Sequence, residues 1–205
     1  MEDWQLILLT AVVTTLGTVL VTFVGHRMTT SKDSRAERDR HARYLAIRVV
    51  CVLDPFVSEC CNVVQDSGMP DHKGTFRPRF DDPEISFPDD VDWRSIAPNL
   101  MYRILGFGNE IEVARQSIAF ADDEIAFPLF YDDYFDARII GYGQLGLAAL
   151  SLADDLRNSY GIPVRDYGDW NPRTMLESKV AEAKKRKTES ESRQAASSDE
   201  MMDRM

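Results

Sequence analysis

Residues Ile139–Gly146 read IIGYGQLG, and this stretch decides between a nucleotide-binding α/β fold and an all-α fold. In dinucleotide-binding proteins the pattern G-x-G-x-x-G joins a strand to a helix, and an acidic residue follows about twenty positions later. Here Ala137–Ile140 fits a short strand, Leu147–Tyr160 fits a helix, and Asp166 lies at a suitable distance. Taken locally, the segment matches a cofactor site.

The apolar phase around these glycines favours a helix instead. One face repeats at spacings of four and three without a break, at Phe135, Ile139, Tyr142, Gly146, Ala149, Ala153, Leu156 and Tyr160. A strand and tight turn would reset that phase, and the chain lacks the Val- and Ile-rich parallel strands that a dinucleotide fold needs. We therefore predict one helix over about 131–160, capped by Gly161. Each interior glycine costs about 1 kcal/mol relative to alanine, so we expect these glycines to allow close approach of another helix.

The remaining pattern predicts an all-α cytoplasmic bundle over residues 35–187, built on two long helices at about 35–65 and 131–160. Between them lies a Pro-rich connection at 67–91, which is either a set of solvated acids with phenylalanines packed on the domain or a loop that docks a partner. Shorter helices are expected at Pro98–Leu105 and from Asn109 to about Ala121, separated by Gly106 and Gly108. A capping box at Thr174 predicts a last helix, and the polar residues 188–205 are expected to be disordered.

An uncharged stretch at the start predicts a membrane anchor within residues 1–25. Trp4–Val24 has no charged residue, and its helical length of about 31 Å matches a bilayer core. Because the first residues are acidic and a small-residue cleavage site is missing, we interpret this stretch as a single uncleaved span rather than a signal peptide. Its threonines recur every fourth residue and are candidates for packing against another membrane helix or for bonding to their own backbone: Thr10, Thr14, Thr18 and Thr22.

Basic residues after this span set its orientation. Arg27 and Lys32 lie in the juxtamembrane linker at 26–34, and Arg35, Arg38, Arg40 and Arg43 follow. The positive-inside rule places the N-terminus outside and the helical domain in the cytoplasm, at an inner or plasma membrane. The bilayer is therefore one expected partner.

Composition argues against nucleic acid as a partner and favours a reducing compartment. Lys and Arg number 24 against 34 Asp and Glu, giving a net charge of −10, whereas nucleic-acid binding relies on neutralising phosphates. The three cysteines, Cys51, Cys60 and Cys61, are spaced so that they neither pair nor share a metal along one helix. We interpret them as three buried free thiols.

The sequence offers no arrangement typical of catalysis, and we predict no catalytic, cofactor-binding or metal-binding residues. The histidines are His26, His41 and His72, and none has a partner at a spacing typical of a nucleophile or metal site. The favoured hypothesis is a single-pass membrane protein whose helical domain binds another protein or itself as an interaction or scaffolding module. Two alternatives stay open: a nucleotide-dependent enzyme using residues 141–146, and a membrane structural protein that oligomerises through its span.

Overall fold

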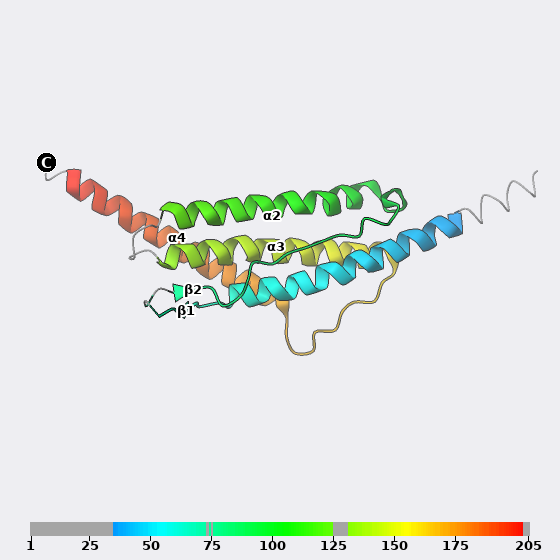
Figure 1. Ribbon diagram of the computed structural model, residues 1–205, viewed down its shortest axis with the longest axis horizontal. Coiled ribbons are helices and arrows are strands. Elements are labelled where there is room, and N and C mark those ends of the chain that lie inside the picture. Colours follow the sequence, from blue (N-terminus) through cyan, green and yellow to red (C-terminus); the bar gives the residue numbers. More distant parts are fainter. Residues whose placement is uncertain (1–34, 73, 75, 125–130, 203–205) are drawn as a thin grey trace, which may run out of the picture. The chain divides into compact units, whose positions relative to one another are not determined.

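The computed structural model describes residues 35–72, 74, 76–124 and 131–202. The chain divides into two compact units, Met1–Tyr44 and Leu45–Met205, and the second unit carries the core. Its described residues are mostly helical, which confirms the predicted all-α class (Figure 1). A first helix occupies residues 35–64, followed by α2 (Pro98–Glu124), α3 (Tyr131–Tyr160) and α4 (Pro172–Met202). Helix α3 packs against both α2 and α4.

The predicted membrane span, Trp4–Val24, lies outside the described residues, as do Thr10, Thr14, Thr18 and Thr22. Among the helices that are described, none is both long enough and apolar enough to cross a membrane. The anchor therefore stays a prediction from the sequence.

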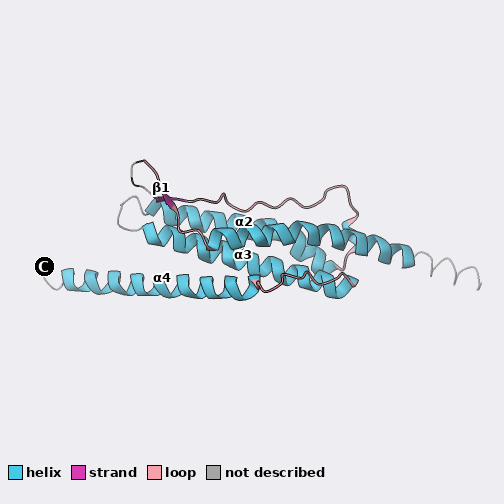
Figure 2. Cartoon of the chain, turned by 90° about the horizontal axis from the view of Figure 1, so that it is seen from below, coloured by secondary structure: helices cyan, strands magenta, loops and turns pink. Residues whose placement is uncertain are grey.

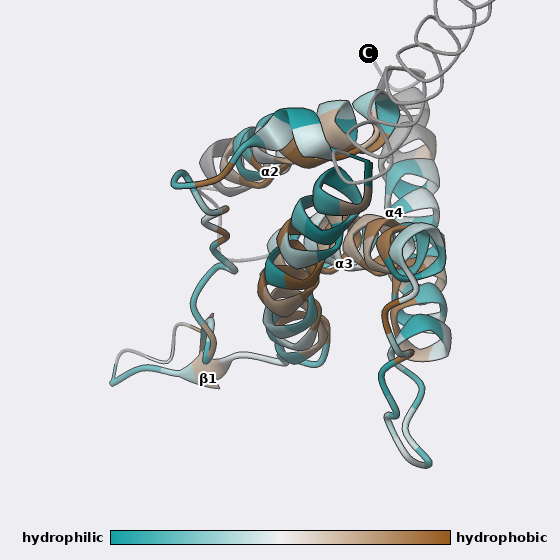
Figure 3. Ribbon diagram, turned by 90° about the vertical axis from the view of Figure 1, so that its right-hand side faces the viewer, coloured by the Kyte–Doolittle hydropathy of each residue, from teal (hydrophilic) through white to brown (hydrophobic). Residues whose placement is uncertain are grey.

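The core is centred on the first helix and α3. From Leu45 onward the first helix buries side chains on more than one face, as its broad apolar pattern predicts. Its Phe56 ring meets Phe107 of α2 edge-on, with centroids 5.5 Å apart. Pro55 is exposed, so its missing N–H faces outward. Figure 3 shows the apolar side of α2 turned toward the other helices.

Helix α2 corrects the prediction of two shorter helices. It runs unbroken through Gly106 and Gly108 to Glu124, so Asn109 lies inside a helix and caps nothing. The apolar phase explains the continuity, because Ile104, Phe107 and Ile111 are all buried on one face across the glycines. Burial of that face outweighs the cost of two helical glycines, about 1 kcal/mol each.

Helix α4 begins earlier than the predicted capping box. The Asn171 side chain accepts a hydrogen bond from the Thr174 N–H at 3.2 Å, and Pro172 occupies the first turn. Thr174 is therefore not the cap. The helix continues to Met202 (Figure 2), through the segment that the composition assigns to a polar tail. The disorder of that tail in solution stays a prediction.

The connection between the first helix and α2 has more structure than the sequence predicts. Two short antiparallel strands, β1 (Met69–Pro70) and β2 (Phe76–Arg77), form a hairpin in it, and a 3-10 turn, η1 (Trp93–Ser95), precedes α2. Phe87 packs on the core, and its ring meets that of Trp93 edge-on with centroids 6.4 Å apart. By contrast, Phe76 and Phe80 are exposed. Only part of the predicted phenylalanine packing is therefore present.

Candidate functional site

The glycines of IIGYGQLG lie within the unbroken α3 helix, so this segment forms no phosphate-binding turn. Each glycine faces a close neighbour. A Cβ added at Gly141 would lie 3.1 Å from Ile118, one at Gly143 2.3 Å from Val180, and one at Gly146 3.0 Å from both Cys60 and Leu176. The expectation of close helix approach is confirmed. Gly161 follows with a φ of +61°, as predicted for the C-terminal cap.

The residues with metal-binding or nucleophilic chemistry are not brought together in the described part of the chain. No group of three His, Cys, Asp or Glu side chains there is placed to hold a metal ion. The cysteines are free thiols, but Cys51 is exposed, so the prediction of three buried thiols is wrong for it. Burial raises the pKa of Cys61 to about 11 and raises that of Cys60 well above its usual value, so neither is a reactive thiolate at neutral pH.

A buried arginine fastens the Pro-rich connection to α3. The Arg138 side chain is 2 % exposed, and its Nη2 donates to the Phe80 carbonyl at 3.0 Å and to Asp82 at 2.8 Å. Asp66, also buried, lies 3.8 Å from Arg138 Nη1 and accepts from the backbone N–H groups of Gly68 and Arg79 at 2.8 and 2.7 Å. Opposite charges thus offset part of the cost of burying Arg138, although its Nε and Nη1 have no hydrogen-bond partner among the described residues. We assign these contacts to holding the fold together.

A second buried arginine joins α3 to the first helix. Arg157 Nη2 donates to both carboxylate oxygens of Asp54, at 2.8 and 2.7 Å, and its Nε donates to the Pro163 carbonyl at 3.2 Å. Toward α4, Asp136 is 4 % exposed and accepts from Arg186 Nε at 3.0 Å. Since each of these charges is paired within the fold, we assign them to stability rather than to chemistry.

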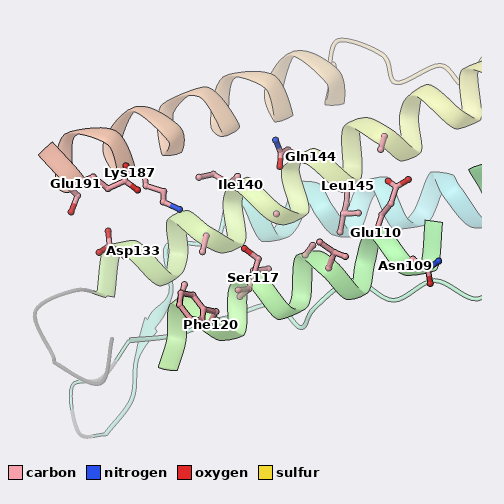
Figure 4. A pocket seen from close by; sticks show the side chains of 18 residues that line it. Asn109, Glu110, Ser117, Phe120, Asp133, Ile140, Gln144, Leu145, Lys187 and Glu191 are labelled. Atoms are coloured by element: carbon pink, nitrogen blue, oxygen red, sulfur yellow. The ribbon is translucent and has the colours of Figure 1, made fainter. Parts of the chain in front are cut away.

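A groove is bounded by α2, α3 and α4 (Figure 4). Its volume is about 1110 Å³, and we call it the α2–α4 groove. The residues that line it lie on successive turns of the three helices: Asn109, Glu110, Val113, Ala114, Ser117, Ile118, Phe120, Ala121, Asp133, Ala137, Ile140, Gly141, Gln144, Leu145, Ala148, Lys187, Ser190 and Glu191. Most are small or apolar, a lining that suits a protein or ligand surface better than a catalytic centre.

Exposed apolar side chains gather on the α2 wall of this groove. Val113 and Phe120 are 65 % and 63 % exposed, and Tyr102 and Leu105 are exposed further along α2. Among the described side chains, α3 and α4 carry no exposed large apolar residue. An apolar patch confined to one helix beside a groove is typical of an interaction site.

Charged side chains are arranged unevenly around the groove. Glu110 of α2, Asp133 of α3 and Glu191 of α4 contribute three acids, and Lys187 contributes one base. Within the described part of the chain, Glu110 and Glu191 make no ion pair. The groove therefore combines an apolar lining with an acidic edge.

Sequence reasoning missed the groove and the buried ion pairs. Arg138 falls between Phe135 and Tyr142 in the apolar phase of α3, and an arginine in that phase was the available signal for a buried charge. The indication of the groove in the sequence was weaker: Val113 and Phe120 are apolar residues on the side of α2 opposite its buried isoleucines. Comparisons of the chain with family models, with curated proteins and with solved structures found no match.

Proposed function

We propose that this chain is a single-pass membrane protein whose cytoplasmic all-α domain binds another protein, and that a helix of this partner docks in the α2–α4 groove. The observation that carries the proposal is the pair Val113 and Phe120, whose large apolar side chains stand exposed beside a groove of about 1110 Å³. Helix-in-groove recognition places apolar side chains of one helix against such a lining. The uncharged stretch Trp4–Val24 supports the anchor.

The absence of a convergent reactive set in the described residues fits a binding role. The buried acid and the two buried arginines of α3 form ion pairs within the fold. The thiols of Cys60 and Cys61 are held protonated by burial. Side chains of neighbouring helices (Ile118, Val180 and Leu176) occupy the space beside the glycines of IIGYGQLG. That stretch therefore leaves no room for a cofactor phosphate.

Site-specific crosslinking in native membranes tests the docking site. A photo-reactive amino acid replaces Ser117, an exposed groove residue, in the full-length protein, and Glu177, exposed on α4 outside the groove lining, serves as the control position. We expect an adduct from position 117 only, with the crosslinked peptide mapping to a helical segment of a different protein.

A matched pair of substitutions shows whether the groove itself is responsible. Val113→Asp places a charge in the groove, and Val164→Asp makes the same change at a residue that is 78 % exposed and outside the lining. The adduct should disappear with Val113→Asp and persist with Val164→Asp, while the circular dichroism of both variants matches that of the unmodified chain. An adduct insensitive to Val113→Asp, an adduct of two copies of this chain, or no adduct would overturn the proposal.

A further inference from the structure

Resting on the proposed function, we infer that the occupant of the α2–α4 groove is an amphipathic helix of about three turns whose apolar face is bordered by Lys and Arg side chains. The inference concerns the chemistry of the partner. It follows from the length of the groove walls, the size of the residues that line them and the charges at their edges.

The walls fix the length of the occupant. On α2 the lining runs from Asn109 to Ala121, and on α3 from Asp133 to Ala148; the two spans cover 12 (121 − 109) and 15 (148 − 133) residue steps. At 1.5 Å per residue, the α2 wall is about 18 Å long and the α3 wall about 22 Å, and the shorter wall corresponds to about three helical turns. A helix of that length lies alongside both walls at once.

The lining residues fix the face that the occupant presents. Small side chains recur along both walls: Ala114, Ser117 and Ala121 on α2, and Ala137 and Ala148 on α3. Small residues let a neighbouring helix approach to the ordinary interaxial distance of about 8–10 Å or less. Val113 and Phe120 stand exposed on the α2 wall. The occupant therefore needs medium-sized apolar side chains at i, i+3, i+4 and i+7.

The charged residues at the edges of the groove determine which charge the occupant should carry beside its apolar face. Three acids, Glu110, Asp133 and Glu191, surround the groove together with one base, Lys187, and the whole chain has a net charge of −10. Basic flanks on the occupant are attracted during encounter and meet the acids once docked. Acidic flanks face repulsion, and a second copy that docks through the same groove brings like charges together. Charge thus argues against self-association through this site.

Synthetic peptides and the full-length protein in a non-ionic detergent test this chemistry. The first probe is a 14-residue helical peptide with leucines on one face and lysines beside them. The second replaces every lysine with glutamate, and the third keeps the lysine composition in a scrambled order without helical period. Binding is measured by fluorescence anisotropy at low and moderate salt, and empty micelles provide the blank. We expect the lysine peptide to bind at least tenfold more tightly than either of the others and to weaken as salt rises.

Charge-removing variants locate the effect at the groove. Glu110→Gln and Glu191→Gln should each weaken the lysine peptide about two- to fivefold, the range for exposed ion pairs. Glu177→Gln, outside the groove, should leave binding unchanged, and Val113→Asp should abolish it. Equal binding of the lysine and glutamate peptides, both lost in Val113→Asp, would overturn the basic partner and leave helix docking intact. The inference would also be overturned if the scrambled peptide bound as tightly as the lysine peptide, or if neither helical peptide bound. The docking function itself is tested separately by the crosslink at position 117.

Discussion

Replacing Gly143 with alanine tests whether the glycines of α3 are present for close helix packing. The added Cβ would lie 2.3 Å from Cγ2 of Val180 and 3.4 Å from Cγ1 of Val64. Valine has one strongly preferred rotamer in a helix, so the clash is relieved only by a strained Val180 or by a shift of α4. Overpacking of this kind costs about 1–3 kcal/mol, and alanine regains about 1 kcal/mol in helix propensity. We expect a net loss of up to about 2 kcal/mol.

Gly108→Ala is the matched control, because a Cβ there would meet nothing within 4 Å. That substitution keeps the propensity gain without the clash and should stabilise the fold by about 1 kcal/mol. Urea unfolding followed by helical circular dichroism gives both values for the full-length protein in the same detergent. The difference between the two variants isolates the packing cost.

A second background decides the cause. Val180→Ala removes the clashing Cγ2, and the atoms that then lie nearest to the added Cβ are Cγ1 of Val64 at 3.4 Å and Cβ of residue 180 at 3.8 Å, both ordinary contacts. In that background Gly143→Ala should become stabilising, as Gly108→Ala is in the unmodified chain. If Gly143→Ala stabilises the unmodified chain as much as Gly108→Ala does, close approach of α4 is not the reason for the glycine.

Three further outcomes follow from buried groups. A maleimide should modify Cys51 in the folded chain and spare Cys60 and Cys61, because only Cys51 is exposed; mass spectrometry should show three modified thiols after unfolding, and labelling of all three before unfolding would contradict the packing. Burial raises the pKa of Cys61 from 9.0 to about 11, so the folded state holds this proton more tightly, and its contribution is complete below pH 9 and is lost as the pH rises toward 11. The free energy of unfolding from urea titrations should fall over that range by on the order of 2 kcal/mol, and less steeply in Cys61→Ala; an unchanged slope would remove Cys61 as the cause. Arg157→Met removes the partner of Asp54 at 2.7 Å and leaves this partly buried carboxylate with Arg165 3.8 Å away. It should cost about 2–3 kcal/mol, partly restored by Asp54→Leu, whereas Arg103→Ala, which breaks the exposed pair with Asp155, should cost less than about 1 kcal/mol by the same urea assay.

The features predicted from the sequence are those with a local cause. The bounds of α3 follow from an apolar phase that continues through Gly141, Gly143 and Gly146 and from the glycine that ends the helix. The central place of the first helix follows from its broad apolar surface. In each case the information lies within one segment, so the amphipathic period is enough to find it.

Features that depend on distant segments were not predicted. Arg138 meets Asp82 across a separation of 56 residues, and Arg157 meets Asp54 across 103, so neither pairing has a local signature. Gly106 and Gly108 resemble a helix end by composition, yet burial of Phe107 between them keeps α2 continuous. The groove likewise exists only once α2, α3 and α4 are assembled.

The last prediction concerns Val113 and Phe120, because packing of the core does not explain why these two large apolar side chains are exposed on α2. Helix α2 buries Ile104, Ile111 and Ile118 on one face, and Val113 and Phe120 stand exposed away from it. In an exposed helical position both residues have lower propensity than alanine, by several tenths of a kcal/mol. Replacing both with alanine should therefore leave the urea stability unchanged or slightly raised while the crosslink at position 117 is lost. A loss of stability above about 2 kcal/mol would mean that these side chains serve the core, and the argument for a docking surface on α2 would fail.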